Sequence, residues 1–354
     1  MSTYLLVDIG AGTMDVLFGD DETGLQYKAV VASPVIEVAD QIAATSGNLV
    51  LTGMEMGGGA VTRVVKERAG RAAVVISEPA AATLNHNLDK VASWGLQVVS
   101  EKEAQRWIND ARYSHVVLTD LDLNRLKNIV AGFGVPFSFD ILAVCAQDHG
   151  VPPRGISHLD YRHNCFVDIL KPSPRPHLLI YDHKNVPSEM NRLKSIMQQA
   201  LKVPAGIVYV MDSGMAAILG ATTDENARQM EPLVVLDVAT SHTVGAVMTA
   251  GKIAGFFEYH THDITRKRLE ALIQDLANGD LSHEQILSEG GHGCYLRETV
   301  GYENIQGIIA TGPKRDLVRG SKLPIVWGAP LGDNMMTGNA GMLAAIKSKK
   351  VLTC

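Results

Sequence analysis

The feature of this chain that most restricts its fold is a short pattern that occurs twice. Residues 8–18 read Asp-Ile-Gly-Ala-Gly-Thr-Met-Asp-Val-Leu-Phe, and residues 237–247 read Asp-Val-Ala-Thr-Ser-His-Thr-Val-Gly-Ala-Val. Each copy begins with an aspartate at the end of an apolar strand, continues through small and hydroxylated residues, and returns as a second strand. Gly24 and Gly251 then provide a turn before a third strand. The pattern predicts that the chain uses one β-hairpin arrangement twice.

The remainder of the chain alternates strand-like and helix-like segments, which is typical of an α/β sheet covered by helices. The length of 354 residues favours two domains, and we expect them at about 1–205 and 206–354. Residues 148–177 interrupt the alternation, because this stretch contains five prolines and several histidines. A run of this length without regular structure indicates either a functional loop or an element that the pattern does not reveal.

Composition limits the partners and the compartment. The formal net charge of −6 argues against a general nucleic-acid or anionic-membrane binder. The first residues lack the basic segment of a signal peptide, and no uncharged run reaches the length of a membrane-spanning helix. We therefore expect a cytoplasmic protein with reduced thiols. Four cysteines stand far apart, which gives poor support to a disulfide framework, a zinc ribbon or an iron–sulfur motif: Cys145, Cys165, Cys294 and Cys354.

The first copy of the pattern has the composition of a phosphate-binding turn. Gly10 and Gly12 allow backbone N–H groups to approach an anion closely. Thr13 adds a hydroxyl donor, and the Asp8 carboxylate suits a hydrated Mg²⁺. The segment is neither a P-loop nor a Rossmann fingerprint, because the Lys-Ser/Thr pair is missing and the chain continues as a strand. The alternative is a tight β-turn with a capping threonine.

The second copy is less rich in glycine. Ala239 and Ser241 occupy positions where glycine would be easier, whereas Thr240, Ser241 and Thr243 still offer hydroxyl groups. His242 provides an N–H donor in place of a missing backbone contact. Taken alone, this segment is more typical of a strand with a polar turn. Paired with the first copy, it forms the second half of a phosphate clamp.

The layout resembles the superfamily of ATPases that contains actin, sugar kinases and 70-kDa heat-shock chaperones (ASKHA). Residues 8–13 match its first phosphate loop closely, and residues 237–243 match the second in part. Residues 212–220 and 338–345 are similar to its two small-residue connecting helices, and residues 308–314 to its adenosine motif. The resemblance covers the chain from end to end. It implies an α/β fold with two related ribonuclease-H-like domains flanking a nucleotide cleft, and ATP and Mg²⁺ as ligands.

The resemblance also implies a set of site residues. Asp8 and Asp237 hold the metal through water, and the Gly312 turn supports the adenosine. The implied cofactor-binding residues are Asp8, Gly10, Ala11, Gly12, Thr13, Thr240, Ser241, His242, Thr243, Gly312, Pro313 and Lys314. The candidate catalytic residues are Asp148 as general base, Asp237, and Glu258 as a water-positioning acid. His260 and His262 share one strand face and are a candidate transition-metal pair, although surface or core histidines are commoner.

Two classes of function follow. The first is hydrolysis of ATP or transfer of its terminal phosphoryl group to a small hydroxylated acceptor. The second is an ATP-driven conformational switch acting on a protein client, and a nucleotide-binding protein without turnover is a third alternative. The chain is also similar to a family labelled as activating enzymes of pyruvate formate-lyase. Radical chemistry of that type uses an iron–sulfur cluster held by closely spaced cysteines, which this sequence lacks. The oligomeric state is not predicted.

Overall fold

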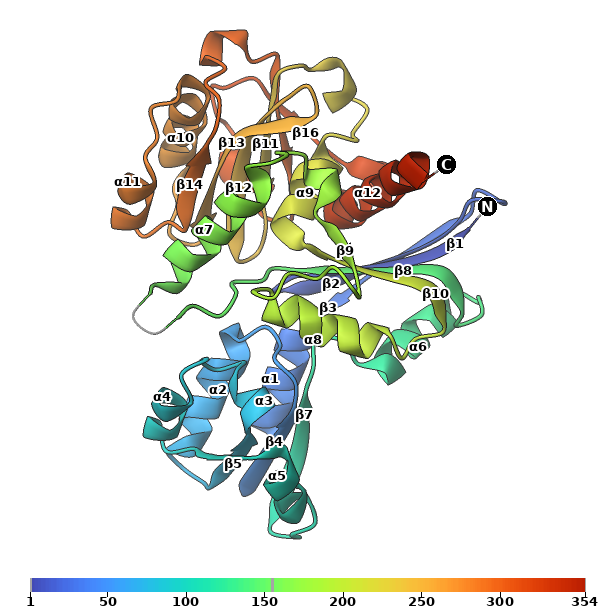
Figure 1. The fold of residues 1–354 in the computed structure, drawn as a ribbon, viewed down its shortest axis with the longest axis vertical. Helices are drawn as coiled ribbons and strands as arrows, with labels where there is room; N and C mark the ends of the chain where they lie inside the picture. Colours follow the sequence, from blue (N-terminus) through green and yellow to red (C-terminus); the bar gives the residue numbers. More distant parts are fainter. Residues whose placement is uncertain (1, 154–155, 354) are drawn as a thin grey trace.

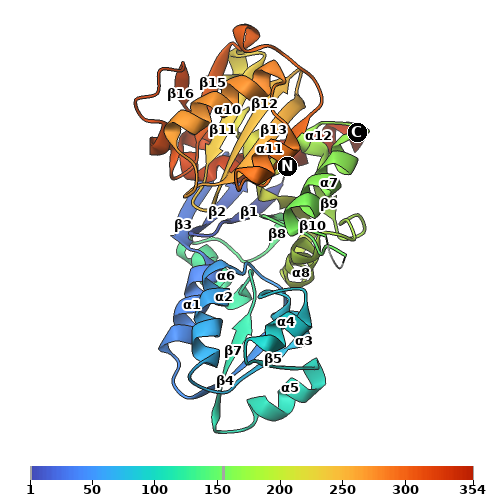
Figure 2. The same ribbon diagram turned by 90° about the vertical axis from the view of Figure 1, so that its left-hand side faces the viewer.

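The computed structural model describes residues 2–153 and 156–353, which form three β-sheets along the longest axis of the molecule (Figure 1). The two larger sheets have six strands each, and the smallest has four. Figure 2 shows the four-stranded sheet and the C-terminal sheet at opposite ends, with the N-terminal sheet between them.

The N-terminal sheet begins with the first predicted hairpin. Strands β1, β2 and β3 are antiparallel neighbours, β8 and β10 continue the sheet in parallel with β1, and the short β9 closes the edge. In spatial order the strands are β3 (Gln26–Ala32), β2 (Thr13–Asp20), β1 (Thr3–Ile9), β8 (Phe139–Ala146), β10 (Ala205–Asp212) and β9 (Ile180–Asp182).

The C-terminal sheet has the same arrangement. Strands β11, β12 and β13 form an antiparallel meander, and β15 and β16 follow in parallel on the other side of β11. In spatial order the strands are β14 (Gly293–Leu296), β13 (Lys252–His260), β12 (His242–Thr249), β11 (Leu233–Val238), β15 (Gly307–Thr311) and β16 (Ile325–Trp327).

When the edge strands β9 and β14 are left out, both sheets place their strands in the order third, second, first, fourth, fifth. The predicted turn glycines have matching backbone angles, because Gly24 has a φ of 71° and Gly251 a φ of 67°, in the left-handed region that glycine adopts most easily. The expectation of two related ribonuclease-H-like α/β domains is confirmed.

A four-stranded parallel sheet is inserted between β3 and β8 and forms a lobe with its own hydrophobic core. Sequence analysis did not separate it from the first domain. Its strands in order are β6 (Gln97–Val99), β5 (Val74–Ser77), β4 (Asn48–Gly53) and β7 (Tyr113–Leu118). Its helices are α1 (Pro34–Ala44), α2 (Gly59–Ala69), α3 (Glu78–Ala81), α4 (Leu88–Ser93) and α5 (Glu101–Ile108).

Two small-residue helices, α9 and α12, pack against each other between the two large sheets (Figure 1). Buried residues of both helices join one hydrophobic core with β1, β8 and parts of β11 and β12. The remaining helices are α6 (Leu123–Gly132), α7 (His158–Leu170), α8 (Asn191–Ala200), α9 (Ser213–Ala221), α10 (Arg266–Asn278), α11 (His283–Ser288) and α12 (Thr337–Thr353).

The structure differs from the expected organisation in two places. Strand β10 pairs with β8, so the N-terminal sheet continues beyond the expected boundary at residue 205. The stretch 148–177 contains α7, which starts at an N-cap formed by Ser157 and packs against β14 of the C-terminal sheet. The prolines flank this helix rather than interrupt it, which is why their number concealed it.

In the described part of the chain, no helix is both long and apolar enough to cross a membrane. Cys145, Cys165 and Cys294 are free thiols, as expected, and Cys354 lies outside the described residues.

Candidate functional site

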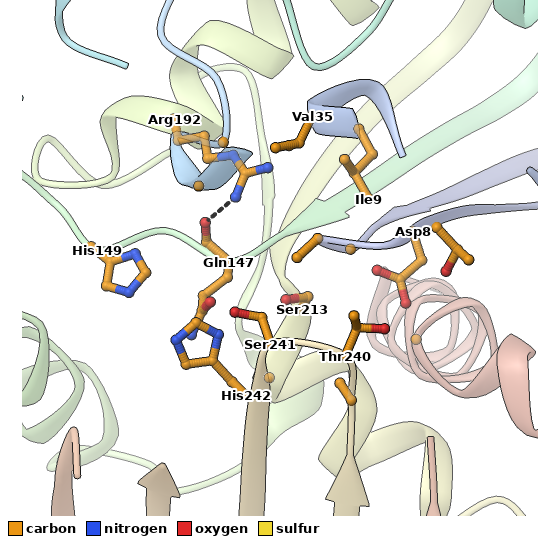
Figure 3. A pocket seen from close by; sticks show the side chains of 18 of the residues that line it. Asp8, Ile9, Val35, Gln147, His149, Arg192, Ser213, Thr240, Ser241 and His242 are labelled. Carbon is orange, nitrogen blue, oxygen red and sulfur yellow. Dashed lines mark hydrogen bonds between the residues drawn. The ribbon is translucent and has the colours of Figure 1, made fainter. Parts of the chain in front are cut away.

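A cavity of about 350 Å³ lies where the two predicted turns meet, and this volume is within the range of about 300–1,000 Å³ typical of small-molecule sites. Residues of both large sheets and of the inserted lobe line it. Figure 3 shows Thr240, Ser241 and His242 on one side, with Arg192 and Val35 across from them. Asp8 lies at one end and His149 at the other.

The first turn is fixed by backbone hydrogen bonds and by one buried serine. The N–H of Gly10 donates to the carbonyl of Thr13 at 2.9 Å. Ser33 donates from its hydroxyl to the Gly10 carbonyl at 2.6 Å and from its N–H to the Gly12 carbonyl at 3.0 Å. Ser33 also caps α1. The turn is therefore held before any ligand arrives.

The second turn repeats this geometry. The N–H of Ala239 donates to the carbonyl of His242 at 3.0 Å, which is the counterpart of the bond between Gly10 and Thr13. The two turns lie against each other, because a Cβ added to Gly12 would be 3.0 Å from the side chain of Thr240. The structure thus brings together the two halves of the predicted clamp.

Acidic side chains gather at the cavity. Asp8 on β1 and Asp15 on β2 are direct cross-strand partners, a position in which like charges repel. Burial, together with the nearby Asp237 and Asp212, raises the pKa of Asp8 to about 7, against a hydrogen bond with Cys145. Burial and then Asp8 raise the pKa of Asp15 to about 8. Burial also raises the pKa of Asp237 to about 6, against a hydrogen bond from Thr311 at 2.8 Å.

These carboxylates fit a bound cation. None of the ion pairs found within residues 2–153 and 156–353 includes Asp8, Asp15 or Asp237, and Asp15 Oδ1 is buried without a hydrogen-bond partner there. Uncompensated buried carboxylates are unfavourable unless protonated or paired with a cation. When these carboxyl groups lose their protons, the site gains the negative charge that a Mg²⁺ ion would neutralise.

The free energy of unfolding of the ligand-free protein is expected to fall as the pH rises from about 6.5 to about 8. Asp8 and Asp15 have pKa values in the folded state of about 7 and 8, above the value of about 3.9 in an unfolded chain. Between these pH values the folded state binds more protons than the unfolded chain. The contribution of the two carboxyl groups to the free energy of unfolding is therefore complete below about pH 4 and is lost as the pH rises through their pKa values in the folded state. Buried His149 and His242 have lowered pKa values and produce the opposite slope, but only below about pH 6.5. Urea titrations at the two pH values measure the difference, and a higher midpoint at pH 8 would contradict it.

The predicted adenosine turn borders the same cavity through Gly312 and Pro313. Gly312 has a φ of 89°, and a Cβ there would be 2.5 Å from the carbonyl of Val238. The N–H of Lys314 donates to that carbonyl at 2.9 Å, so Lys314 joins the turn to β11 rather than lining the cavity.

Asp148 does not line the cavity, although its neighbours Gln147 and His149 do. Its carboxylate accepts hydrogen bonds from the N–H groups of Gly150 at 2.8 Å and Leu193 at 2.9 Å. Burial raises its pKa to about 6 against these two bonds. This geometry gives Asp148 a role in holding the loop after β8 and offers no support for the predicted general base.

Thr243 is fully buried, and its hydroxyl is 3.0 Å from that of Thr261. Because side chains alternate along a strand, His242 faces the cavity and Thr243 points away. Glu258 does line the cavity, but Arg162 binds it at 3.1 Å. Burial alone would raise the pKa of Glu258, yet Arg162 holds it well below its usual range. Glu258 is thus an ionised carboxylate in a buried ion pair.

Several polar residues of the site escaped sequence analysis. Arg162 of α7 is buried and also binds Asp212 at 3.0 Å. Arg192 of α8 lines the cavity and binds Asp120 at 2.7 Å. Glu55 and His86 of the inserted lobe line it too. A single charged residue in a sequence does not indicate which residue it will contact, so only the fold identifies these members of the site.

Histidines gather at the end of the cavity marked by His149. Burial, and then Arg162, lower the pKa of His149 well below its usual range, and burial lowers the pKa of His242 to about 3. Both imidazoles are therefore neutral at pH 7, able to donate one hydrogen bond or to bind a metal. The ring of His242 also lies 4.8 Å from that of His260, its cross-strand partner, whereas His262 is exposed.

Comparison with known sequences identifies the family. The model of the family described as "Putative pyruvate format-lyase activating enzyme (DUF1786)" matches residues 56–317. The chain belongs to this family. No curated protein sequence matches the chain.

Three solved structures illustrate what this DUF1786 member is similar to. The ethanolamine utilization protein EutJ from Carboxydothermus hydrogenoformans is 11% identical, with 96% of this chain and 88% of that chain covered and a TM-score of 0.32. AlfA from the Bacillus subtilis plasmid pLS32 is 11% identical, with 97% and 98% covered and a TM-score of 0.37. MreB5 of Spiroplasma citri, bound to ADP, is 11% identical, with 98% and 97% covered and a TM-score of 0.34. Likeness at these scores carries no functional argument, and the fold rests on the strand order described above.

The activity in the family description does not fit the thiols of this member. Cys145 is fully buried in β8 of the N-terminal sheet, whereas Cys294 is buried in β14 of the C-terminal sheet. The one group of three metal-ligating residues found in residues 2–153 and 156–353 contains histidines alone. A cysteine-held iron–sulfur cluster has no ligand set in this part of the chain.

Proposed function

We propose that this protein binds Mg–ATP in the cavity and hydrolyses its terminal phosphoanhydride bond or transfers the phosphoryl group to a small hydroxylated acceptor. The observation that carries this proposal is the contact between two equivalent strand-end turns, each preceded by an aspartate, at one cavity. Backbone N–H groups of such turns bind phosphate oxygens.

Each group of residues around the cavity has a separate role in the proposed binding of Mg–ATP. The turn of Gly10, Ala11 and Thr13 and the turn of Thr240, Ser241 and His242 provide hydrogen-bond donors from opposite sides. Asp8 and Asp237 would hold Mg²⁺, which when bound offsets the charge of the phosphates. Gly312 and Pro313 offer a backbone surface for the adenosine. Catalysis of phosphoryl transfer depends mainly on positioning and charge stabilisation. The two turns and the two aspartates are therefore sufficient for slow turnover of ATP.

A second candidate is an ATP-driven switch that acts on a protein client. The engagement of Asp148 by two backbone N–H groups favours it, because the base predicted for an acceptor hydroxyl is then occupied. The packing of α9 against α12 between the two sheets also provides a place where relative motion of the halves can begin. For a switch we expect ATP hydrolysis that a protein stimulates, and for a kinase turnover only with the correct small acceptor.

Isothermal calorimetry tests the shared part of the two candidates. We expect the protein to bind ATP and ADP in the presence of Mg²⁺, with an affinity at least about tenfold lower when EDTA removes the ion, since ionised Asp8 and Asp237 then face the phosphates without compensation. Absence of binding heat at millimolar nucleotide with Mg²⁺ would refute the proposal.

A further inference from the structure

Four histidines from separate segments meet at one end of the cavity. His149 belongs to the loop after β8 of the N-terminal sheet. The other three come from the C-terminal sheet, where His242 begins β12, His260 ends β13 and His292 immediately precedes β14. The cluster therefore spans the boundary between the two large sheets.

Three of these side chains have the spacing of a metal site. One ring nitrogen from each of His149, His242 and His292 lies within 4.8 Å of the others. In a tetrahedral zinc site with Zn–N distances of about 2.0–2.1 Å, ligand nitrogens are about 3.3 Å apart. Small changes in side-chain torsion angles are thus enough to bring the three nitrogens to bonding distance.

The cluster also contains polar atoms that the described residues leave without partners. His242 Nε2 and His292 Nδ1 are buried and accept or donate no hydrogen bond within residues 2–153 and 156–353. His292 is only 5% exposed. Buried polar atoms without partners are unfavourable and usually indicate a water or ion that satisfies them.

The surrounding charge allows a divalent cation. Glu258 Oε1 lies 3.7 Å from His292 Nδ1, and Gln147 donates to the same oxygen. Arg162 brings a positive charge, but Glu258 at 3.1 Å and Asp212 at 3.0 Å surround it with two carboxylates. Glu258, Asp212 and Arg162 together carry one net negative charge, which favours a bound cation.

We propose that His149, His242 and His292 form a site for one divalent transition-metal ion of the Zn²⁺ type. Three imidazoles select such an ion over Mg²⁺, which prefers oxygen ligands. Three protein ligands leave a fourth position for water or a substrate oxygen. His149 and His242 line the cavity, so that position borders the space in which a ligand binds.

His260 supports the site from outside the ligand set. Nε2 of His260 lies 2.9 Å from Nε2 of His292, which fixes the orientation of the His292 ring. The other nitrogen of that ring, Nδ1, has no hydrogen bond within residues 2–153 and 156–353 and is the one that would bind the ion. Such outer contacts orient metal-ligating histidines and raise their basicity.

Titration of the metal-free full-length protein with Co²⁺ tests the site without nucleotide, so its outcome does not depend on the proposed function. We expect one equivalent to bind with the intense visible absorption of tetrahedral cobalt, and Zn²⁺ to displace it while excess Mg²⁺ does not. Saturation without that absorption, or no binding at micromolar metal, would overturn the proposal.

Variants locate the ion. His149→Ala and His292→Ala are each expected to lower the Zn²⁺ affinity by more than about 100-fold, since even outer partners of metal ligands are worth about 10–100-fold. His183→Ala, at an exposed histidine, is the matched control and should bind like the wild type. If His292→Ala does not fold, His149→Ala alone tests the site. We expect that variant to fold because His149 lies on a loop. Wild-type affinity in His149→Ala would place the ion elsewhere and refute the site.

Discussion

Asp8→Asn is expected to abolish Mg²⁺-dependent ATP binding while it stabilises the ligand-free protein at pH 8. Asp8 faces Asp15 across the hairpin and is near Asp237, so its negative charge is unfavourable until a cation arrives. The amide has no charge and nearly the same shape. Since the folded pKa of Asp8 is about 7, removal of the charge is worth up to about 4 kcal/mol at pH 8.

Two measurements separate this effect from general damage. Calorimetry with Mg–ATP should show a loss of at least about 100-fold in affinity, comparable with the loss in rate when one group that stabilises developing charge is removed from an active site. Urea unfolding at pH 8 should show a higher midpoint than the wild type. Asp21→Asn, at an exposed residue that follows β2 of the same hairpin, should change neither. A variant that keeps Mg-dependent binding would remove Asp8 from the ion site.

Gly220→Ala and Gly341→Ala are expected to destabilise the protein severely. A Cβ on Gly220 would lie 1.8 Å from the carbonyl oxygen of Thr337, and a Cβ on Gly341 would lie 1.9 Å from that of Ala216. Because both obstacles are backbone atoms, α9 and α12 must separate to admit a methyl group. We expect a loss of about 3 kcal/mol or more from either substitution, at the upper end of overpacking costs.

Gly132→Ala provides the matched control at the end of α6. A Cβ there would meet nothing within 4 Å, and alanine favours a helix over glycine by up to about 1 kcal/mol. Denaturant midpoints of the three variants compare the two environments directly. Equal stability of Gly220→Ala and Gly132→Ala would show that the contact between α9 and α12 is looser than described.

The repeated hairpin was predictable because its determinants are local. A strand-end aspartate, small turn residues and a following strand lie within a dozen residues, and Gly10 and Ala239 form the same turn hydrogen bond. The two connecting helices were recognisable for a related reason, since close packing requires runs of small residues such as those around Gly220 and Gly341.

The rest of the site depends on contacts between distant segments. Strand β10 joins the N-terminal sheet through pairing with β8, which no local pattern specifies. Arg162 is buried because Asp212 and Glu258 flank it, and these residues are remote from it in sequence. His292 and His242 are likewise distant in sequence and meet only in the folded chain. Sequence analysis marked His260 and His262 as a candidate pair, but the partners that give the cluster its geometry come from other strands.

Ser33 joins the first turn to the inserted lobe. Its hydroxyl and N–H hold two carbonyls of the turn, and the same residue starts α1. The position of the turn and the start of α1 are thus fixed by the same side chain and N–H group. A single buried residue therefore connects the lining of the cavity to the inserted lobe.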